Sequence, residues 1–286
     1  MNLKNLFLFM LLLTFNYLNA QPKVFNYSVG NYKVHLLSER QGEGNKEILI
    51  NATDDILKEC LSGGTYPNAM NCFLVETGKE NILIDAGLGI GLNECLKMVG
   101  KKADDIDVVY ITHLHGDHFG GLVQNGQKSF PKIKLYIARS EFDYWTSDLA
   151  KGADNARNVL SLYKENLVLF EPGTFEKPFE MITGIKGIAA YGHTPGHTGF
   201  LIESENSKLF IWGDLTHAMA IQMPYPQVAV TYDVNPKMAV ETRQWVLKYL
   251  ETHQIPVAGM HIQFPAIGHL KKNNKEGYEF LFVDSF

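Results

Sequence analysis

Several features that mark special classes of protein are scarce in this sequence of 286 residues. It has only 3 cysteines, Cys60, Cys72 and Cys95, and their spacing matches no zinc motif. An odd count leaves one thiol outside any disulfide, so small buried cysteines are the simpler interpretation. We find no low-complexity linker and no long block of like charges. A polybasic tail and a polybasic membrane patch are therefore not expected.

The composition excludes further classes. Hydrophobic residues make up 45% of the chain and charged residues 20%, which does not fit a collagen-like, coiled-coil or disordered protein. The formal charge is −5, from 26 basic and 31 acidic residues. A mildly acidic chain lacks the basic surface of a nucleic-acid binder, so no nucleic-acid partner is expected. About 250 residues suit one large domain with a deep core.

Beyond the first twenty residues, no apolar run is long enough to span a bilayer. The start of the chain differs: Lys4 precedes the apolar run Leu6–Phe15, and Leu18-Asn-Ala20 suits cleavage before Gln21. This pattern predicts a secretory signal peptide at 1–20 and a mature domain at 21–286. The alternative is an uncleaved membrane anchor, for which the run is short. We expect an exported protein, periplasmic or secreted, without a stable membrane span after removal of the leader.

Strand-like and helix-like segments alternate along the rest of the chain, which predicts one composite α/β domain. The alternation alone fits a doubly wound sheet as well as a sandwich of two helix-flanked sheets. Asn235 can cap a long helix, and Pro236 suits its first position. The predicted strands cover 32–37, 71–76, 81–85, 108–112, 134–138, 187–191, 199–203, 208–212, 255–258 and part of 278–283. The predicted helices cover 92–99, 141–145, 154–163 and 236–252.

Three histidines and one aspartate stand close together directly after the predicted strand 108–112. The segment reads Thr112-His-Leu-His-Gly-Asp-His-Phe-Gly-Gly121. Side chains of an extended chain repeat every second residue, so His113 and His115 can point the same way. Asp117 and His118 follow where the chain should turn into a helix, and they can reach a second metal from another side. Imidazole and carboxylate are good ligands for zinc and its neighbours, so the segment predicts a metal site rather than a solvated polar loop.

Three further segments place polar groups where apolar strands end. Residues 191–198 read Tyr-Gly-His-Thr-Pro-Gly-His-Thr, which is rich in turn-forming residues. Asp214 comes directly after the predicted strand 208–212, and His261 follows the predicted strand 255–258. Loops at sheet ends often carry functional groups, so these segments are expected to complete the metal site.

Taken together, the motifs resemble the metallo-β-lactamase superfamily: His-x-His-x-Asp-His, Gly-His-Thr-Pro-Gly-His, Trp-Gly-Asp and the late His261. The segments 218–224 and 261–269 resemble the methyl parathion hydrolase branch, which is similar to metal-dependent lactonases and aryl esterases. The resemblance implies an α/β fold with four layers, the αβ/βα sandwich of the metallo-β-lactamase fold, with two metals at one edge.

The resemblance also implies a set of seven ligands. One ion would be held by His113, His115 and His197, the other by Asp117, His118 and His261, with Asp214 shared between them. Two divalent metal ions are therefore expected; zinc is preferred, and manganese, cobalt and iron accept the same ligands. Three other histidines are expected outside the set: His193 as a loop or supporting residue, His217 near Asp214, and His269 as a support for the metal loop.

Two such ions can lower the pKa of a shared water, so that a bridging hydroxide is available near neutral pH. We therefore expect a metal-dependent hydrolase that acts on esters or lactones, and on aryl phosphotriesters. The catalytic carboxylates would be Asp117 and Asp214. Both bind metal in this interpretation, so neither is a free general base, although Asp117 can deliver a proton after the attack.

The expected partner is a small-molecule ester, lactone or phosphotriester. Trp145 resembles an aromatic position that lines the pocket in the methyl parathion hydrolase branch, and an aromatic wall suits aryl or hydrophobic substrates. The other expected pocket residues are Phe119, Met219, Ile221 and Tyr225, for each of which core packing is the alternative. The chain is also compatible with a homodimer.

Three other functions remain open. A glyoxalase II-like thioesterase shares the histidine motif. A mononuclear iron sulfur dioxygenase shares it too, but the presence of both His118 and His261 favours a second metal and hydrolysis. A noncatalytic metal-binding protein is the third alternative, and the complete ligand set argues against it.

Overall fold

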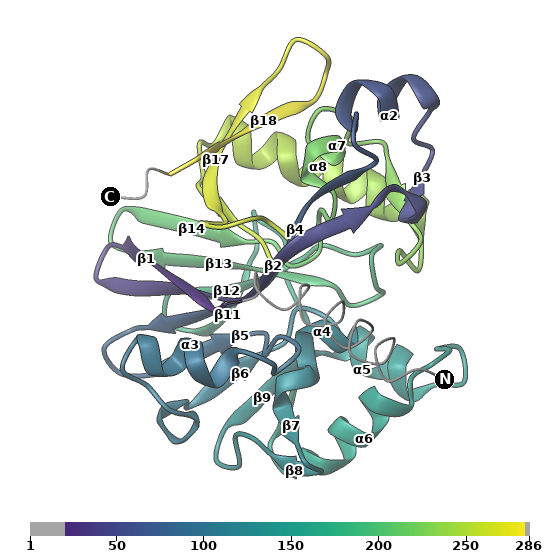
Figure 1. The fold of residues 1–286 in the computed structure, drawn as a ribbon. Coiled ribbons are helices and arrows are strands. Elements are labelled where there is room, and N and C mark those ends of the chain that lie inside the picture. Colours follow the sequence, from purple (N-terminus) through teal and green to yellow (C-terminus); the bar gives the residue numbers. More distant parts are fainter. Residues whose placement is uncertain (1–20, 284–286) are drawn as a thin grey trace, which may run out of the picture.

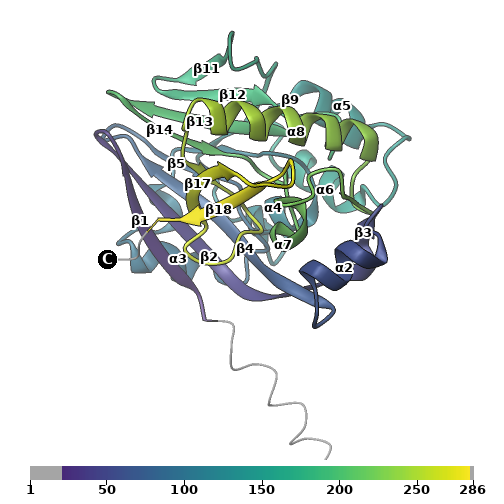
Figure 2. The same ribbon diagram turned by 90° about the horizontal axis from the view of Figure 1, so that it is seen from above.

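The computed structural model describes residues 21–283, so the predicted leader lies outside the described residues. Within this range the strands form two seven-stranded sheets packed face to face, with helices on the outer faces (Figure 1, Figure 2). The fold is the four-layer αβ/βα sandwich that the resemblance implied. The doubly wound alternative is wrong, because the strands divide between two sheets.

The first sheet is mixed. Its strands from β1 to β5 pair antiparallel, and those from β5 to β10 pair parallel. In spatial order the strands are β1 (Lys23–Val29), β2 (Tyr32–Asn45), β4 (Thr65–Glu76), β5 (Asn81–Ile84), β6 (Val108–Tyr110), β9 (Lys134–Ala138) and β10 (Leu167–Phe170). Strands β2 and β4 run well past the expected 32–37 and 71–76. Their added length forms a long hairpin that projects beyond the sheet (Figure 1).

The second sheet is antiparallel except where β14 pairs parallel with β16. In spatial order its strands are β11 (Phe179–Ile182), β12 (Ile185–Ala189), β13 (Thr198–Ser204), β14 (Ser207–Ile211), β16 (Val257–Ala258), β17 (Ile267–Lys272) and β18 (Tyr278–Phe282). The predicted strands at 199–203 and 208–212 are confirmed as β13 and β14. Strands β11 and β17 were not predicted.

The helices lie outside the sheets, and the longest is α8, which has the predicted bounds, Pro236–Thr252. The Asn235 side chain accepts the Met238 N–H and so caps this helix, as expected. The other α-helices are α2 (Asp54–Cys60), α3 (Leu92–Met98), α4 (Gly116–Phe119), α5 (Arg139–Thr146), α6 (Asp154–Leu162) and α7 (Met219–Gln222). Short 3-10 turns are η1 (Lys46–Ile48), η2 (Ala103–Asp105) and η3 (Gly120–Leu122), and two-residue strands are β3 (Leu49–Ile50), β7 (Val123–Gln124), β8 (Gln127–Lys128) and β15 (Ala229–Val230).

Apolar burial explains the layering. Buried side chains of both sheets, such as Phe73 and Phe200, meet in one cluster, to which the inner face of α8 adds Val246 and Leu250. A second cluster packs α3, α5 and α6 against the other face of the first sheet. Each sheet thus buries both faces, which explains why β5 and β14 each end in three consecutive buried apolar residues. The polar groups at the strand ends are held by this rigid frame.

Two smaller expectations concern membranes and thiols. None of the helices within 21–283 is long and apolar enough to cross a bilayer. All three cysteines are free; Cys72 and Cys95 are buried and Cys60 is half-buried. The interpretation of the cysteines as small packing residues is confirmed for the two buried ones.

Candidate metal centre

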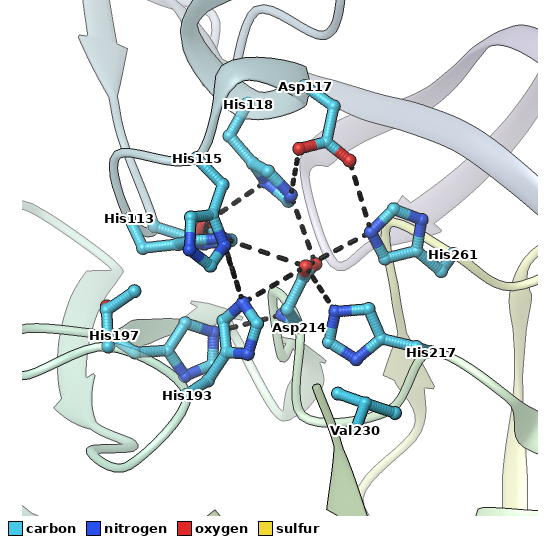
Figure 3. A network of polar contacts seen from close by, with 12 residues as sticks. His113, His115, Asp117, His118, His193, His197, Asp214, His217, Val230 and His261 are labelled. Carbon is cyan, nitrogen blue, oxygen red and sulfur yellow. Dashed lines mark hydrogen bonds and ion pairs between the residues drawn. The ribbon is translucent and has the colours of Figure 1, made fainter. Parts of the chain in front are cut away.

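The loops that follow β6, β12, β14 and β16 meet at one edge of the sandwich. His113 and His115 follow β6, and α4 then begins at Gly116 and carries Asp117 and His118. The loops of the second sheet add His193, Asp214 and His261 from the opposite side (Figure 3). Residues from 113 to 261 therefore converge because their strands end at the same edge.

Asp214 lies at the centre of this group (Figure 3). Its Oδ1 is 3.2 Å from His118 Nε2, and its Oδ2 is 3.1 Å from His261 Nε2. The same Oδ2 lies 3.6 Å from His113 Nε2 and 3.5 Å from His193 Nε2. The carboxylate thus faces both halves of the site, which is the position that a shared ligand needs.

Three groups of donor atoms surround Asp214: two clusters flank it, and a third group, Asp214, His217 and His261, overlaps both. The first consists of His113, His115 and His193, with Asp214 itself; the second consists of Asp117, His118 and His261. In the first, His115 Nδ1 is 3.0 Å from His113 Nε2 and 2.9 Å from His193 Nε2. Zinc–nitrogen bonds of about 2.0–2.1 Å in a tetrahedron would place ligand nitrogens about 3.3 Å apart. The spacing fits one small ion.

Two buried atoms support the same conclusion. His118 Nε2 and Asp214 Oδ1 have no hydrogen-bond partner among the described residues, although both are buried. A buried polar atom without a partner is costly, and a cation between these two atoms would satisfy both. The His/Asp clusters therefore fit two divalent metals.

The structure corrects one expected ligand. His197 uses both ring nitrogens inside the protein: Nδ1 donates to the Ala190 carbonyl oxygen at 2.7 Å, and Nε2 accepts the Asp214 N–H at 2.9 Å. Neither nitrogen faces the clusters. The place expected for His197 is taken by His193, which was expected outside the ligand set. Gly192, directly before His193, has φ at 125°, a conformation that favours glycine, and the sequence pattern does not reveal which of the two histidines points inward.

The ligand rings are held by two aspartates that were not expected at the site. Asp85 Oδ2 lies 2.6 Å from His118 Nδ1, and Asp233 Oδ1 lies 2.8 Å from His193 Nδ1. Such contacts fix the orientation and tautomer of a ligating imidazole. Asp85 directly follows the apolar strand β5, so it carried the same strand-end signal as Asp214. Asp233 had no such signal.

His217 also belongs to this environment. It is buried, and its Nε2 lies 2.9 Å from Asp214 Oδ2. Its ring stacks on that of His261 at a centroid distance of 5.0 Å. The contact of Nε2 with Asp214 lets His217 hold the shared carboxylate. His269, by contrast, is exposed on β17. Its position on that strand gives no support for the expected hydrogen bond to the metal loop.

Burial and charge divide the histidines into two kinds. Burial lowers the pKa of His113 and His193 well below the usual value, and lowers that of His115 to about 4. These imidazoles are neutral at pH 7, the form that binds metal. At His261 burial opposes protonation, but Asp214 and Asp117 outweigh it and raise the pKa to about 9. The second cluster thus attracts positive charge, which suits a cation.

A cavity of about 800 Å³ opens above the clusters. His115, Asp117 and Asp214 form part of its wall, together with His217 and His261. The long β2–β4 hairpin supplies most of the rest. The other lining residues are Arg40, Gly42, Glu43, Gly44, Asn45, Ile48, Tyr66, Asn68, Ala69, Met70, Leu88, Gly116, Asn155 and Tyr232.

The five residues expected to bind substrate do not line this cavity. Trp145 is buried against the apolar core; its ring packs edge-on against His115, and its Nε1 donates to Glu141 Oε1. Phe119 lies in the same core cluster. Ile221 is buried in a separate apolar cluster near α7, and Tyr225 packs against that cluster. Met219 lines a different pocket. Core packing, the alternative interpretation, explains Trp145, Phe119 and Ile221. The β2–β4 wall could not be predicted from the sequence, because its residues follow no catalytic motif.

Comparison with known proteins agrees with this geometry. Residues 65–252 match the family model of the metallo-beta-lactamase superfamily. The chain belongs to the metallo-beta-lactamase superfamily. The resemblance stated from the motifs is thus confirmed, and the matched range contains six of the seven expected ligands, all but His261.

Matches to individual relatives cover a smaller part of the chain than the family model does. An N-acyl homoserine lactonase of Bacillus cereus is 27% identical over 168 residues, which cover 49% of this chain and 60% of the relative. The uncharacterized protein YobT of Bacillus subtilis (strain 168) is 30% identical over 145 residues, which cover 51% and 61%. The chain thus spans about three fifths of the length of these curated relatives.

Solved structures share the fold over nearly the whole chain. The dizinc quorum-quenching lactonase AidC superposes with a TM-score of 0.85 at 24% identity, covering 94% of this chain and 99% of that one. The hydrolase AbOPH gives a TM-score of 0.82 at 24% identity, covering 92% and 98%. At this identity the likeness establishes the shared architecture.

Proposed function

We propose that this superfamily member is a metal-dependent hydrolase that opens lactones and cleaves related esters. The observation that carries the proposal is the position of Asp214, which lies between two clusters of histidine and aspartate at the wall of a cavity. N-acyl homoserine lactonases among the relatives, and the lactonase among the similar structures, support lactones as the substrate class.

In this proposal the chain's own residues form two metal sites. His113, His115 and His193 would hold one ion, and Asp117, His118 and His261 the other, with Asp214 between them. We propose zinc as the resident metal, because histidine and carboxylate are its usual ligands and the nitrogen spacing fits its bond lengths. When bound, two such ions would polarise the substrate carbonyl and lower the pKa of water toward neutrality.

The two carboxylates are suited to different tasks. Both carboxylates line the cavity, but the Asp214 side chain is 2% exposed, whereas that of Asp117 is 25% exposed. Although burial opposes it, His118 and His261 lower the pKa of Asp117. Asp117 is therefore ionised and reachable, so its carboxylate can first accept the proton that the attacking water gives up and then pass it to the oxygen that leaves when the ester bond breaks. Asp214 serves as a fixed support.

The cavity suits a substrate with both polar and apolar parts. Asn45, Asn68 and Asn155 offer amide groups, while Ile48, Met70 and Leu88 offer apolar contacts. An acylated lactone has a ring, an amide and an apolar chain, which matches this mixture. The expectation of an aryl preference rested on Trp145. Because Trp145 packs in the core and does not line the cavity, the structure gives no support for that preference.

A substrate panel with metal analysis tests the proposal. Purified protein would be assayed on N-acyl homoserine lactones, simple lactones, aryl esters, thioesters, β-lactams and aryl phosphotriesters. We expect two ions per chain and the highest kcat/KM on a lactone. A preference for thioesters would favour the thioesterase alternative, and one iron per chain with sulfur oxidation would favour the dioxygenase. Activity on phosphotriesters alone would contradict the lactone assignment.

Export forms a separate part of the proposal. It rests on the apolar run Leu6–Phe15 and the small residue Ala20 before Gln21. N-terminal sequencing of protein from the native host should begin at or near Gln21. Intact Met1 on protein inside the cell would contradict export and would leave the proposed chemistry unaffected.

A further inference from the structure

Glu141 is a buried carboxylate that the proposed chemistry does not use. It is 1% exposed and stands on α5, outside both metal clusters. Burial of a carboxylate is costly unless its oxygens accept hydrogen bonds. Its contacts show what offsets this cost.

Four donors converge on its two oxygens. Oε1 accepts the backbone N–H of Leu114 at 2.8 Å and the indole N–H of Trp145 at 2.6 Å. Oε2 accepts the hydroxyl of Thr194 at 2.6 Å and the backbone N–H of Gly196 at 2.9 Å. Both oxygens of the carboxylate are therefore fully used.

The partners of Glu141 lie beside the ligands of one cluster only. Leu114 lies between His113 and His115, and Thr194 directly follows His193. One carboxylate therefore ties the loop after β6, in the first sheet, to the loop after β12, in the second. Gly196 makes the approach possible, because a Cβ there would lie 2.3 Å from the backbone nitrogen of Glu141.

The second cluster has other supports. His118 contacts Asp85, and His261 Nδ1 lies 3.0 Å from the Ala69 carbonyl oxygen. Neither contact involves Glu141. Because the two clusters are supported separately, loss of Glu141 should affect them unequally.

We propose that Glu141 is a positioning residue for the first metal site: it sets the distance between the His113–His115 loop and the His193 loop. This inference rests on the proposed dinuclear centre. Glutamine cannot replace the carboxylate, because its NH₂ group would face a backbone N–H from either orientation. Supporting contacts of this kind typically contribute about 10–100-fold to metal affinity.

The test measures the affinity of each of the two zinc ions separately, by competition with a chromophoric chelator. His193→Ala defines the pattern for loss of the first site, and His261→Ala defines it for the second. We expect Glu141→Gln to lower the zinc affinity of one site by about 10–100-fold. The affected site should be the one that His193→Ala identifies. The visible spectrum of the cobalt-loaded variant should change as well, because altered spacing changes the ligand geometry.

Glu39→Gln is the matched control. Glu39 is also a buried carboxylate, and it accepts backbone N–H groups of Leu88, Gly89 and Gly91, none of which adjoins a ligand. This variant should lose stability but keep both zinc affinities and the cobalt spectrum. The control thus separates a positioning role from general destabilisation.

A milder variant covers the case in which Glu141→Gln does not fold. Thr194→Val removes one donor and keeps the shape of the side chain, so it should weaken the same zinc by a smaller factor. Unchanged zinc binding in the folded Glu141 or Thr194 variant, or equal weakening of both sites, would overturn the proposal. Wild-type protein that binds no metal would instead contradict the dinuclear centre itself, and with it this role.

Discussion

His193 and His197 are alike in the sequence, yet the backbone gives them different roles. His193 sends Nε2 to the first cluster and Nδ1 to Asp233. His197 instead bonds the Ala190 carbonyl and the Asp214 N–H. Gly213 makes the second contact possible: its φ is 61°, and a Cβ there would lie 2.4 Å from His197 Nε2. One histidine thus faces the metal site, and the other holds the loop that carries the shared carboxylate.

The two histidines should therefore differ on substitution. His193→Ala is expected to lose one of two zinc ions. His197→Ala should keep two at saturating zinc and lose about 1–3 kcal/mol of unfolding free energy, because a buried N–H and a buried carbonyl lose their partner. Metal analysis and urea denaturation measure these quantities. Loss of one ion in the His197 variant, with two retained in the His193 variant, would restore the ligand set expected from the sequence.

Asp214 and His261 make a second contrast among single residues. Asp214→Ala removes a ligand from both sites, so occupancy of both should fall. His261→Ala should mainly deplete the second site. The loss in zinc affinity should exceed the roughly 10–100-fold typical of supporting residues. Equilibrium dialysis followed by metal analysis distinguishes the two patterns. Full metal and full activity in both variants would show that the centre is assigned to the wrong residues.

At the scale of elements, α8 supports the site through one buried cation. Arg243 donates from Nε to the Leu215 carbonyl at 2.6 Å, and from Nη1 to the carbonyls of Pro226 and Val228 at 3.0 and 2.7 Å. Leu215 directly follows Asp214. The helix thereby fixes the loop that carries the shared ligand, as well as the segment that leads into β15.

We expect Arg243→Met to cost about 3–5 kcal/mol of unfolding free energy, because several carbonyls lose a charged donor in a buried place. Lys237→Met is the control on the same helix, since Lys237 is exposed and pairs only with exposed Glu241. It should change stability little. Chemical denaturation of both variants gives the comparison. Equal stabilities would mean that packing alone holds α8.

Elements with a strong local signal could be predicted from the sequence, and others could not. The α8 bounds followed from the cap at Asn235 and the apolar stripe along the helix. Strand β17 was missed because its sequence, Ile-Gly-His-Leu-Lys-Lys, is neither a continuous apolar run nor a regular alternation, and its pairing with β16 and β18 is tertiary. The projecting ends of β2 and β4 were missed for a similar reason: their polar residues pair only with each other.

At the scale of the molecule, the site was predictable where its residues are contiguous or end an apolar strand. His113 to His118 lie in one segment, and Asp214 and His261 each follow a strand. The choice between His193 and His197 depended on their tertiary contacts, and the cavity wall depended on the long-range pairing of β2 with β4. Glu141 lies in an ordinary helix. No local pattern reveals that its partners come from two different sheets.

The metal centre joins those two sheets, so metal removal should weaken the whole molecule. Four proposed ligands, His113, His115, Asp117 and His118, lie in the loop and helix that follow β6 of the first sheet, and His193, Asp214 and His261 lie in loops of the second. A ligand that binds only the folded state stabilises it by about 2.7 kcal/mol at 100 times its dissociation constant. For a domain of this size, that corresponds to roughly 5–10 °C in Tm for each site. Chelation should therefore lower the Tm of wild-type protein, and added zinc should restore it. Asp214→Ala, measured in parallel, should respond much less. If zinc raised the Tm of both proteins equally, or of neither, the sheets would not be joined through this centre.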